Sequence, residues 1–90
     1  MTRNVLLVLV RSRKDSAAKV QSILTAWGCF IKTRLGLHGG TLDECADDGL
    51  LFLELAGDAE RHVEMARKLN LLPGVSAQLV TLSVADQAAD

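Results

Sequence analysis

Residues 4–10 read NVLLVLV, an uninterrupted apolar run of strand length that is rich in Leu and Val. Side chains alternate between the two faces of a strand, so both faces of this segment are apolar. Such a strand needs cover on both sides. The sequence therefore predicts a central strand that lies between two apolar layers.

The pattern changes to a helical period after residue 15. Apolar residues at helical spacing predict a helix at about residues 16–27, which Asp15 or Ser16 can cap and Gly28 can end. Period-two alternation then predicts a strand over residues 29–37, and the turn-rich HGGTLDECADDG follows it.

The second half of the chain repeats this order. The apolar run at residues 50–56 predicts a third strand, and Asp58 can cap a second helix that ends near residue 70. Val63, Ala66 and Leu69 mark the predicted buried face of that helix, and a fourth strand follows at residues 75–84.

The element order is thus β-α-β-β-α-β, two β-α-β halves in tandem. Right-handed crossovers then give an α+β, ferredoxin-like plait: a four-stranded antiparallel sheet in the order 4-1-3-2 with both helices on one face. We expect a single domain over residues 1–85 and a polar tail at 86–90. Many unrelated functions use this fold, so the fold alone decides none of them.

Composition narrows the function classes. The chain of 90 residues is 49% hydrophobic but only 3% aromatic, and its net charge is −1. This charge gives no bulk attraction to nucleic acid, so no direct nucleic-acid binding is expected. Met1 precedes a strand-like run, and no segment approaches the apolar length of a membrane span. We therefore expect a cytoplasmic protein without membrane contact and with reduced cysteines.

Known chemistries of the plait fit this sequence poorly. The loop RSRKDS after the first strand holds neither the C-x-x-C of copper chaperones nor the glycines of an acylphosphatase cradle. The first strand has no aromatic residue and the third has only Phe52, so base stacking is disfavoured. No nucleophile has a paired base at convincing spacing. The chain is therefore predicted to be no enzyme, and no cofactor is assigned.

One edge of the predicted sheet gathers the candidate binding residues. The first and second strands end there, beside the LPG turn, so Arg11, Arg13 and His38 come near the start of the first helix. Arg34, on the second strand, completes the candidate set for a small ligand. Salt bridging between loops is the alternative reading of these charges.

Metal binding is a further reading of the same region. His38 and Cys45 flank one turn with acidic residues nearby, although the spacing matches no strong ligand motif and a solvated hairpin loop explains it equally. Cys29 is too far from His38 to share an ion and is expected at the edge of the core. His62 is expected to be exposed.

Three segments carry a family resemblance: IKTRLGLH at residues 31–38, LLFLELAGD at 50–58 and LNLLPGVSAQLVTLSV at 69–84. Together they resemble the small regulators of iron-only hydrogenase systems, which are ACT-like in fold and related in shape to the C-terminal domain of nickel-responsive repressors. The resemblance implies an oligomer with a regulatory role. The glycine that amino-acid-binding ACT domains have in the first loop is absent here, as is the histidine cluster of the nickel repressors.

The leading hypothesis is a non-catalytic regulatory module that self-associates and senses a small effector. The alternatives are a metal-responsive module that uses His38, and a dimeric plait enzyme with an active site between protomers.

Self-association follows from the second apolar face of the sheet, which the helices leave bare. We expect a two-fold homodimer through this face, with Leu6, Val8, Phe52 and Val80 at the interface. Pairing along an edge strand is the competing geometry and could extend the assembly to a tetramer. Lys32 and Arg34 are expected on the same open face, where one of them pairs with Glu54.

Overall fold

The computed structural model describes residues 1–11, 14–38 and 49–85, and it confirms the predicted element order. The elements are β1 (Thr2–Val10), α1 (Lys14–Ala26), the 3₁₀ turn η1 (Gly28–Phe30), β2 (Ile31–His38), β3 (Gly49–Leu55), α2 (Ala59–Asn70) and β4 (Val75–Ser83). The predicted tail at 86–90 lies outside the described residues.

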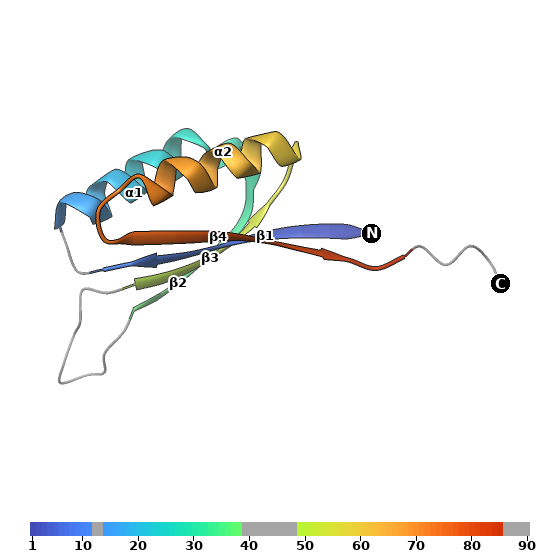
Figure 1. The fold of residues 1–90 in the computed structure, drawn as a ribbon, viewed down its shortest axis with the longest axis horizontal. Coiled ribbons are helices and arrows are strands. Elements are labelled where there is room, and N and C mark those ends of the chain that lie inside the picture. Colours follow the sequence, from blue (N-terminus) through green and yellow to red (C-terminus); the bar gives the residue numbers. More distant parts are fainter. Residues whose placement is uncertain (12–13, 39–48, 86–90) are drawn as a thin grey trace.

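The four strands form one antiparallel sheet in the order β2-β3-β1-β4, which is the predicted order read from the other edge. Both helices lie on the same face of this sheet (Figure 1). β1 is central, and its Leu7 stands opposite Phe52 of β3 and Gln78 of β4. The structure is thus the predicted α+β plait.

The core lies between the sheet and the helices. Leu6 and Val8 of β1 are 0% exposed and pack with the buried residues of β3 and both helices. Their expected place on the open face is therefore wrong, because the alternation of β1 puts Val5, Leu7 and Leu9 on that side instead. The registers place Phe52 and Val80 on the open face, as expected.

An irregularity in β2 changes which side its charged residues face. Ile31 stands opposite Leu55 and Thr33 opposite Glu54, so Lys32 is an extra residue in the ladder. Arg34 then falls opposite buried Leu53 and donates a hydrogen bond to Oε1 of Gln21 on α1. The expectation that Arg34 lies on the open face is therefore wrong.

Glu54 does lie on the open face, opposite Val5, but its partner differs from the prediction. Arg3 of β1 donates two hydrogen bonds to it, from Nε and Nη2, each 2.5 Å long. The Arg3 hydrogen bonds are the main reason that the pKa of Glu54 is lowered, and the charge of Lys32 adds to the effect. Cross-strand pairing of β1 with β3 thus replaces the expected pairing with β2.

The lowered pKa of Glu54 predicts a pH dependence of stability. The Arg3–Glu54 pair contributes fully above the usual carboxyl pKa of 4.5, and its contribution is lost as the pH falls through the lower folded-state pKa. The difference in melting temperature between wild type and Glu54→Gln should therefore be largest near neutral pH and shrink below about pH 4. An identical difference at pH 7 and pH 3 would contradict this assignment.

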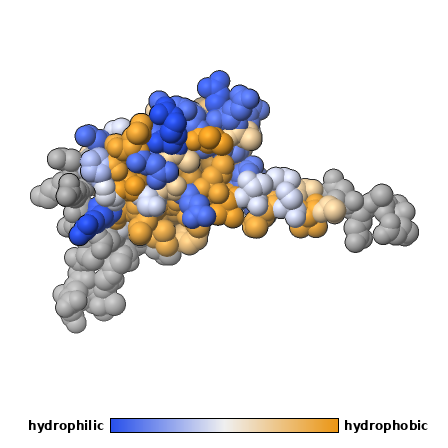
Figure 2. Space-filling model, in the orientation of Figure 1, coloured by the Kyte–Doolittle hydropathy of each residue, from blue (hydrophilic) through white to orange (hydrophobic). Residues whose placement is uncertain are grey.

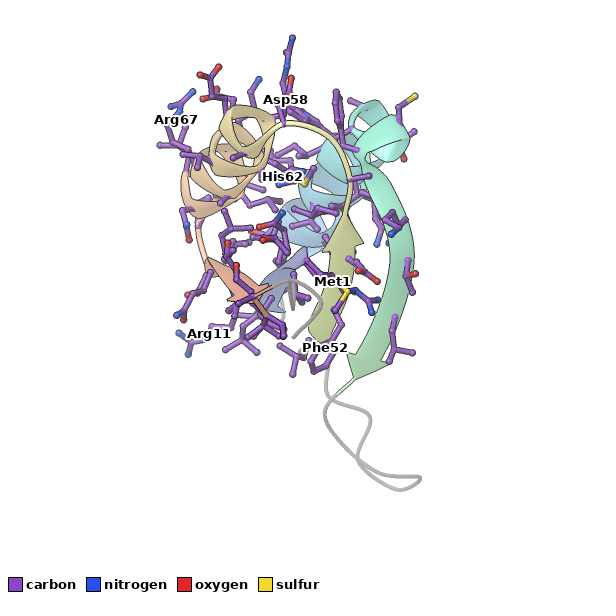
Figure 3. The ribbon with its side chains drawn as sticks, turned by 90° about the vertical axis from the view of Figure 1, so that its right-hand side faces the viewer. Met1, Arg11, Phe52, Asp58, His62 and Arg67 are labelled. Carbon is purple, nitrogen blue, oxygen red and sulfur yellow. The ribbon has the colours of Figure 1, made fainter. Side chains whose placement is uncertain are left out.

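A buried histidine ties α2 to the turn before it. His62 is 0% exposed, and its Nε2 lies 2.7 Å from the carbonyl oxygen of Ala56, so the expectation of an exposed side chain is wrong. Nδ1 is buried without a hydrogen-bond partner among the described residues. Figure 3 shows His62 on the helix side of the sheet and Phe52 on the opposite side.

The η1 turn packs against the same region. The amide of Ala56 donates to the carbonyl of Phe30 at 2.7 Å, and Gly57 adopts a left-handed conformation with φ of 90° beside the Phe30 ring. Gly28 has no positive φ, because the chain continues from α1 into η1 instead of ending in a left-handed cap. Cys29 of η1 is exposed and so does not lie at the edge of the core.

Candidate functional site

The strand ends meet as the topology predicts. Val10 at the end of β1 stands opposite Gly49 of β3 and Val75 of β4, and Gly49 stands opposite His38 of β2. The β1–α1 connection and the turn between α2 and β4 therefore leave the sheet at one edge, on the left of Figure 1. We call this region the strand-end corner and define it by residues 9–11, 16 and 73–76.

Two hydrogen bonds hold the corner together. The amide of Arg11 donates to the carbonyl of Gly74 at 2.7 Å, and the hydroxyl of Ser16 donates to the carbonyl of Pro73 at 2.6 Å. Ser16 is only 3% exposed, so its bond is shielded from water. The two connections are thus fixed to each other, although they are far apart in the sequence.

Gly74 allows the close approach of the two segments. It has a φ of 72°, a conformation that residues with a side chain rarely adopt. A Cβ placed there would come within 3.3 Å of the Cβ of Arg11. The LPG turn therefore brings the backbone of β4 directly against the residue that follows β1.

The corner borders an open hollow of about 420 Å³, a size that suits a small molecule. Its lining residues come from the end of β1 and the start of β4: Leu9, Val10, Arg11, Gly74, Val75 and Ser76. Among the described residues that line it, Arg11 is the one cation and is exposed, whereas the aliphatic side chains supply apolar walls. This arrangement favours an anion with an apolar body.

Of the two predicted ligand-binding residues whose side chains the structure describes, Arg11 lines this hollow and Arg34 does not. Arg34 contacts Gln21, which borders a smaller hollow of about 140 Å³ on the helix side of the sheet. The backbone of His38 reaches the same edge, but β3 separates β2 from β1. Arg13 lies outside the described residues.

The metal hypothesis has no geometric support in the described part of the chain. Cys45 lies outside it, as do the acidic residues of the same turn. Within residues 1–11, 14–38 and 49–85, no group of three or more His, Cys, Asp or Glu side chains is placed to hold an ion.

A search for charged residues and metal-binding residues in the sequence does not identify Leu9, Gly74 and Ser76 as site residues. The signal that could have found them is the LPG turn, whose glycine lies at the start of the strand that pairs with β1. The predicted topology already placed that turn near Arg11, but the register between β1 and β4 was needed to show which residues stand opposite each other there.

Comparisons with known proteins establish the fold. No protein-family model matches the chain, and no curated protein matches it in sequence. An uncharacterised protein from Thermotoga maritima shares the fold with a TM-score of 0.78 at 23% identity, covering 92% of this chain and 100% of the other. This chain thus has the ACT-like form of the ferredoxin-like fold.

Two further structures share this fold at lower identity. A nitrogen regulatory PII-like protein from Thiomonas intermedia K12 matches with a TM-score of 0.61 at 8% identity and 97% coverage of each chain. The ACT domain of a GTP pyrophosphokinase from Chlorobium tepidum matches with a TM-score of 0.57 at 12% identity, over 100% of this chain and 94% of the other.

The two helices of the structure are short and amphipathic. In the described residues, neither α1 nor α2 has the length and apolar character that crossing a bilayer requires.

Proposed function

We propose that this chain is a non-catalytic regulatory module that binds a small organic anion in the strand-end corner. The hollow between β1 and β4 carries the proposal, because its lining combines apolar walls of ligand size with a cationic residue, Arg11. The hydrogen bonds from Arg11 to Gly74 and from Ser16 to Pro73 fix the two segments that line it. A rigid frame of this kind reduces the entropy that a ligand must offset on binding.

The fold neighbours support a ligand-sensing role by analogy. The PII-like protein is described as nitrogen regulatory, and its structure was determined with ADP, AMP and bicarbonate bound. Bicarbonate and the nucleotides are anions, the charge class that the guanidinium of Arg11 would attract. The apolar lining of this hollow favours small carboxylates over nucleotides, so both classes belong in a binding test.

The resemblance of residues 31–38, 50–58 and 69–84 to regulators of iron-only hydrogenase systems supplies a cellular process for the proposal. The net charge of −1 gives no bulk attraction to nucleic acid, so in this proposal regulation acts through a partner protein. Co-purification from the native host, analysed by mass spectrometry, tests this link. Recovery of no hydrogenase or maturation component would count against it.

Thermal-shift measurements with a panel of ligands test the corner itself. The panel holds apolar amino acids, short-chain carboxylates, adenine nucleotides and divalent metal salts. At least one carboxylate should stabilise the wild type, by about 2.7 kcal/mol at a concentration 100 times its Kd. Arg11→Gln should abolish most of this shift, because the charge-assisted contact is lost.

Lys19→Gln is the matched control, since Lys19 is also an exposed cation but lies on α1, outside the lining of the hollow. It should keep the ligand response of the wild type. Equal responses of wild type and Arg11→Gln to every compound would refute the corner as the binding site. A response to metal salts alone would favour the metal-responsive alternative.

A further inference from the structure

The face of the sheet opposite the helices has no cover from the described residues. The registers of the strands place on this face the apolar side chains Val5, Leu7, Leu9, Leu35, Leu50, Phe52, Val80 and Leu82. Leu9, Leu35 and Leu82 are 53%, 54% and 62% exposed. Figure 2 shows apolar surface along the sheet below the helices. We call these side chains the open face.

The size of the open face decides what kind of contact it can make. β1 and β4 have 9 residues each, so the face is about 30 Å long, and its four strands make it about 19 Å wide. The footprint is therefore roughly 500–600 Å² with its polar side chains included, which is the upper end of the range for the largest apolar patch on a typical monomer. Two such faces would bury roughly 1,000–1,200 Å² together, the lower end of specific protein interfaces.

The charges of the open face favour a partner whose contacting surface is mostly uncharged. Arg3 and Glu54 neutralise each other through two hydrogen bonds, and Lys32 acts on Glu54 from the neighbouring strand. These groups lie toward the start of β1, so Leu7, Leu9 and Phe52 stand opposite no charged residue, although Gln78 and Ser76 of β4 are polar neighbours of Leu7 and Leu9. A strongly charged partner, such as nucleic acid or an acidic peptide, would find no complementary field there.

We infer that the occupant of the open face is a second copy of this chain, packed sheet against sheet about a two-fold axis. A second copy offers a face of the same size, the same apolar centre and the same self-neutralised pair, which is the complementarity that an isologous interface needs. Interfaces with so small a buried area are weak, so we expect the homodimer to have a dissociation constant on the order of micromolar. The dimer is argued from the open face and does not depend on the ligand proposal, although Leu9 belongs both to this face and to the lining of the hollow.

Leu9→Glu tests the open face, and Val63→Glu is its matched control. Both side chains are exposed, Leu9 by 53% on β1 and Val63 by 59% on α2, so neither change should unfold the chain. The wild type should sediment at micromolar concentrations toward twice the chain mass of 9.7 kDa. Leu9→Glu should raise the dissociation constant about 100-fold or more, because two unpaired carboxylates would be buried. Val63→Glu should leave it unchanged.

Leu35→Glu on β2 provides a second, independent variant, since Leu35 is 54% exposed on the same face. Circular dichroism confirms that each variant is folded before it is sedimented. A monomeric wild type at every concentration overturns the inference and leaves the face to a different protein. A dimer that survives both Leu9→Glu and Leu35→Glu also overturns it, in favour of pairing along the edge of β2 or β4.

Discussion

His62→Ala should destabilise the protein by about 3 kcal/mol, which lowers the melting temperature of a domain this size by roughly 12–24 °C. His62 is 0% exposed, so its removal leaves a cavity between α2 and the sheet. It also removes the ring nitrogen that contacts the carbonyl of Ala56 at 2.7 Å, which leaves a backbone acceptor without that partner. Urea unfolding and thermal melts measure the loss.

Val63→Ala is the control for this prediction, because Val63 is the next residue on α2 and is 59% exposed. It should change the free energy of unfolding by less than about 0.5 kcal/mol. The pair of variants therefore distinguishes two assignments of the buried face of α2. A larger loss for Val63→Ala than for His62→Ala would place Val63, and not His62, in the core.

Gly57→Ala should cost about 2 kcal/mol, for two reasons that act together. The φ of 90° at Gly57 is strained for any residue with a side chain. In addition, a Cβ would lie 2.8 Å from Cδ1 of Phe30, so the ring and the η1 turn would have to move. Phe30 packs against the core and contacts Trp27 at a ring-centroid distance of 5.6 Å, which limits that movement.

Gly28→Ala is the matched substitution for Gly57→Ala. Gly28 has no positive φ, and a Cβ there would meet no atom within 4 Å. We expect it to be neutral or to stabilise the protein by up to about 1 kcal/mol, because alanine restricts the unfolded chain more than glycine does. Equal losses for the two variants in chemical denaturation would show that backbone strain at Gly57 is not the cause.

The fold could be predicted from the sequence because its strongest signals are periodic and long. Few topologies are compatible with the apolar run at residues 4–10, the two helical segments and the turn residues between the elements. Right-handed crossovers select one of these topologies. The prediction of which face each residue takes was less successful. Leu6 and Val8 were placed on the open face, although β1 is apolar on both sides and alternation alone cannot choose between them.

The errors in α2 and β2 have separate physical causes. Hydrophobicity favoured Val63 over His62 as a buried residue, but the helix turns His62, Met65 and Leu69 toward the sheet. In β2, the extra residue at Lys32 reverses the alternation, and no sequence pattern marks that irregularity. Arg34 consequently reaches Gln21 on α1, and Glu54 pairs with Arg3 instead.

The candidate site was predicted only in its location. Topology brings the strand ends to one edge, so the position of Arg11 there could be predicted, but the walls of the hollow depend on the register between β1 and β4. That register also pairs Thr2 with Ser83, close to the two ends of the described chain.

This pairing has a consequence for how the chain folds. β1 is the first of the four described strands in the sequence, yet one of its two neighbours in the sheet is β4, the last of the four. Closing a loop that joins Met1 to Val84, which exchange backbone hydrogen bonds of 2.9 and 3.0 Å, delays the final contacts and slows folding. Until β4 arrives, β1 has an unpaired edge along its apolar run at residues 4–10. A nascent or truncated chain that ends before residue 75 would therefore expose an aggregation-prone edge.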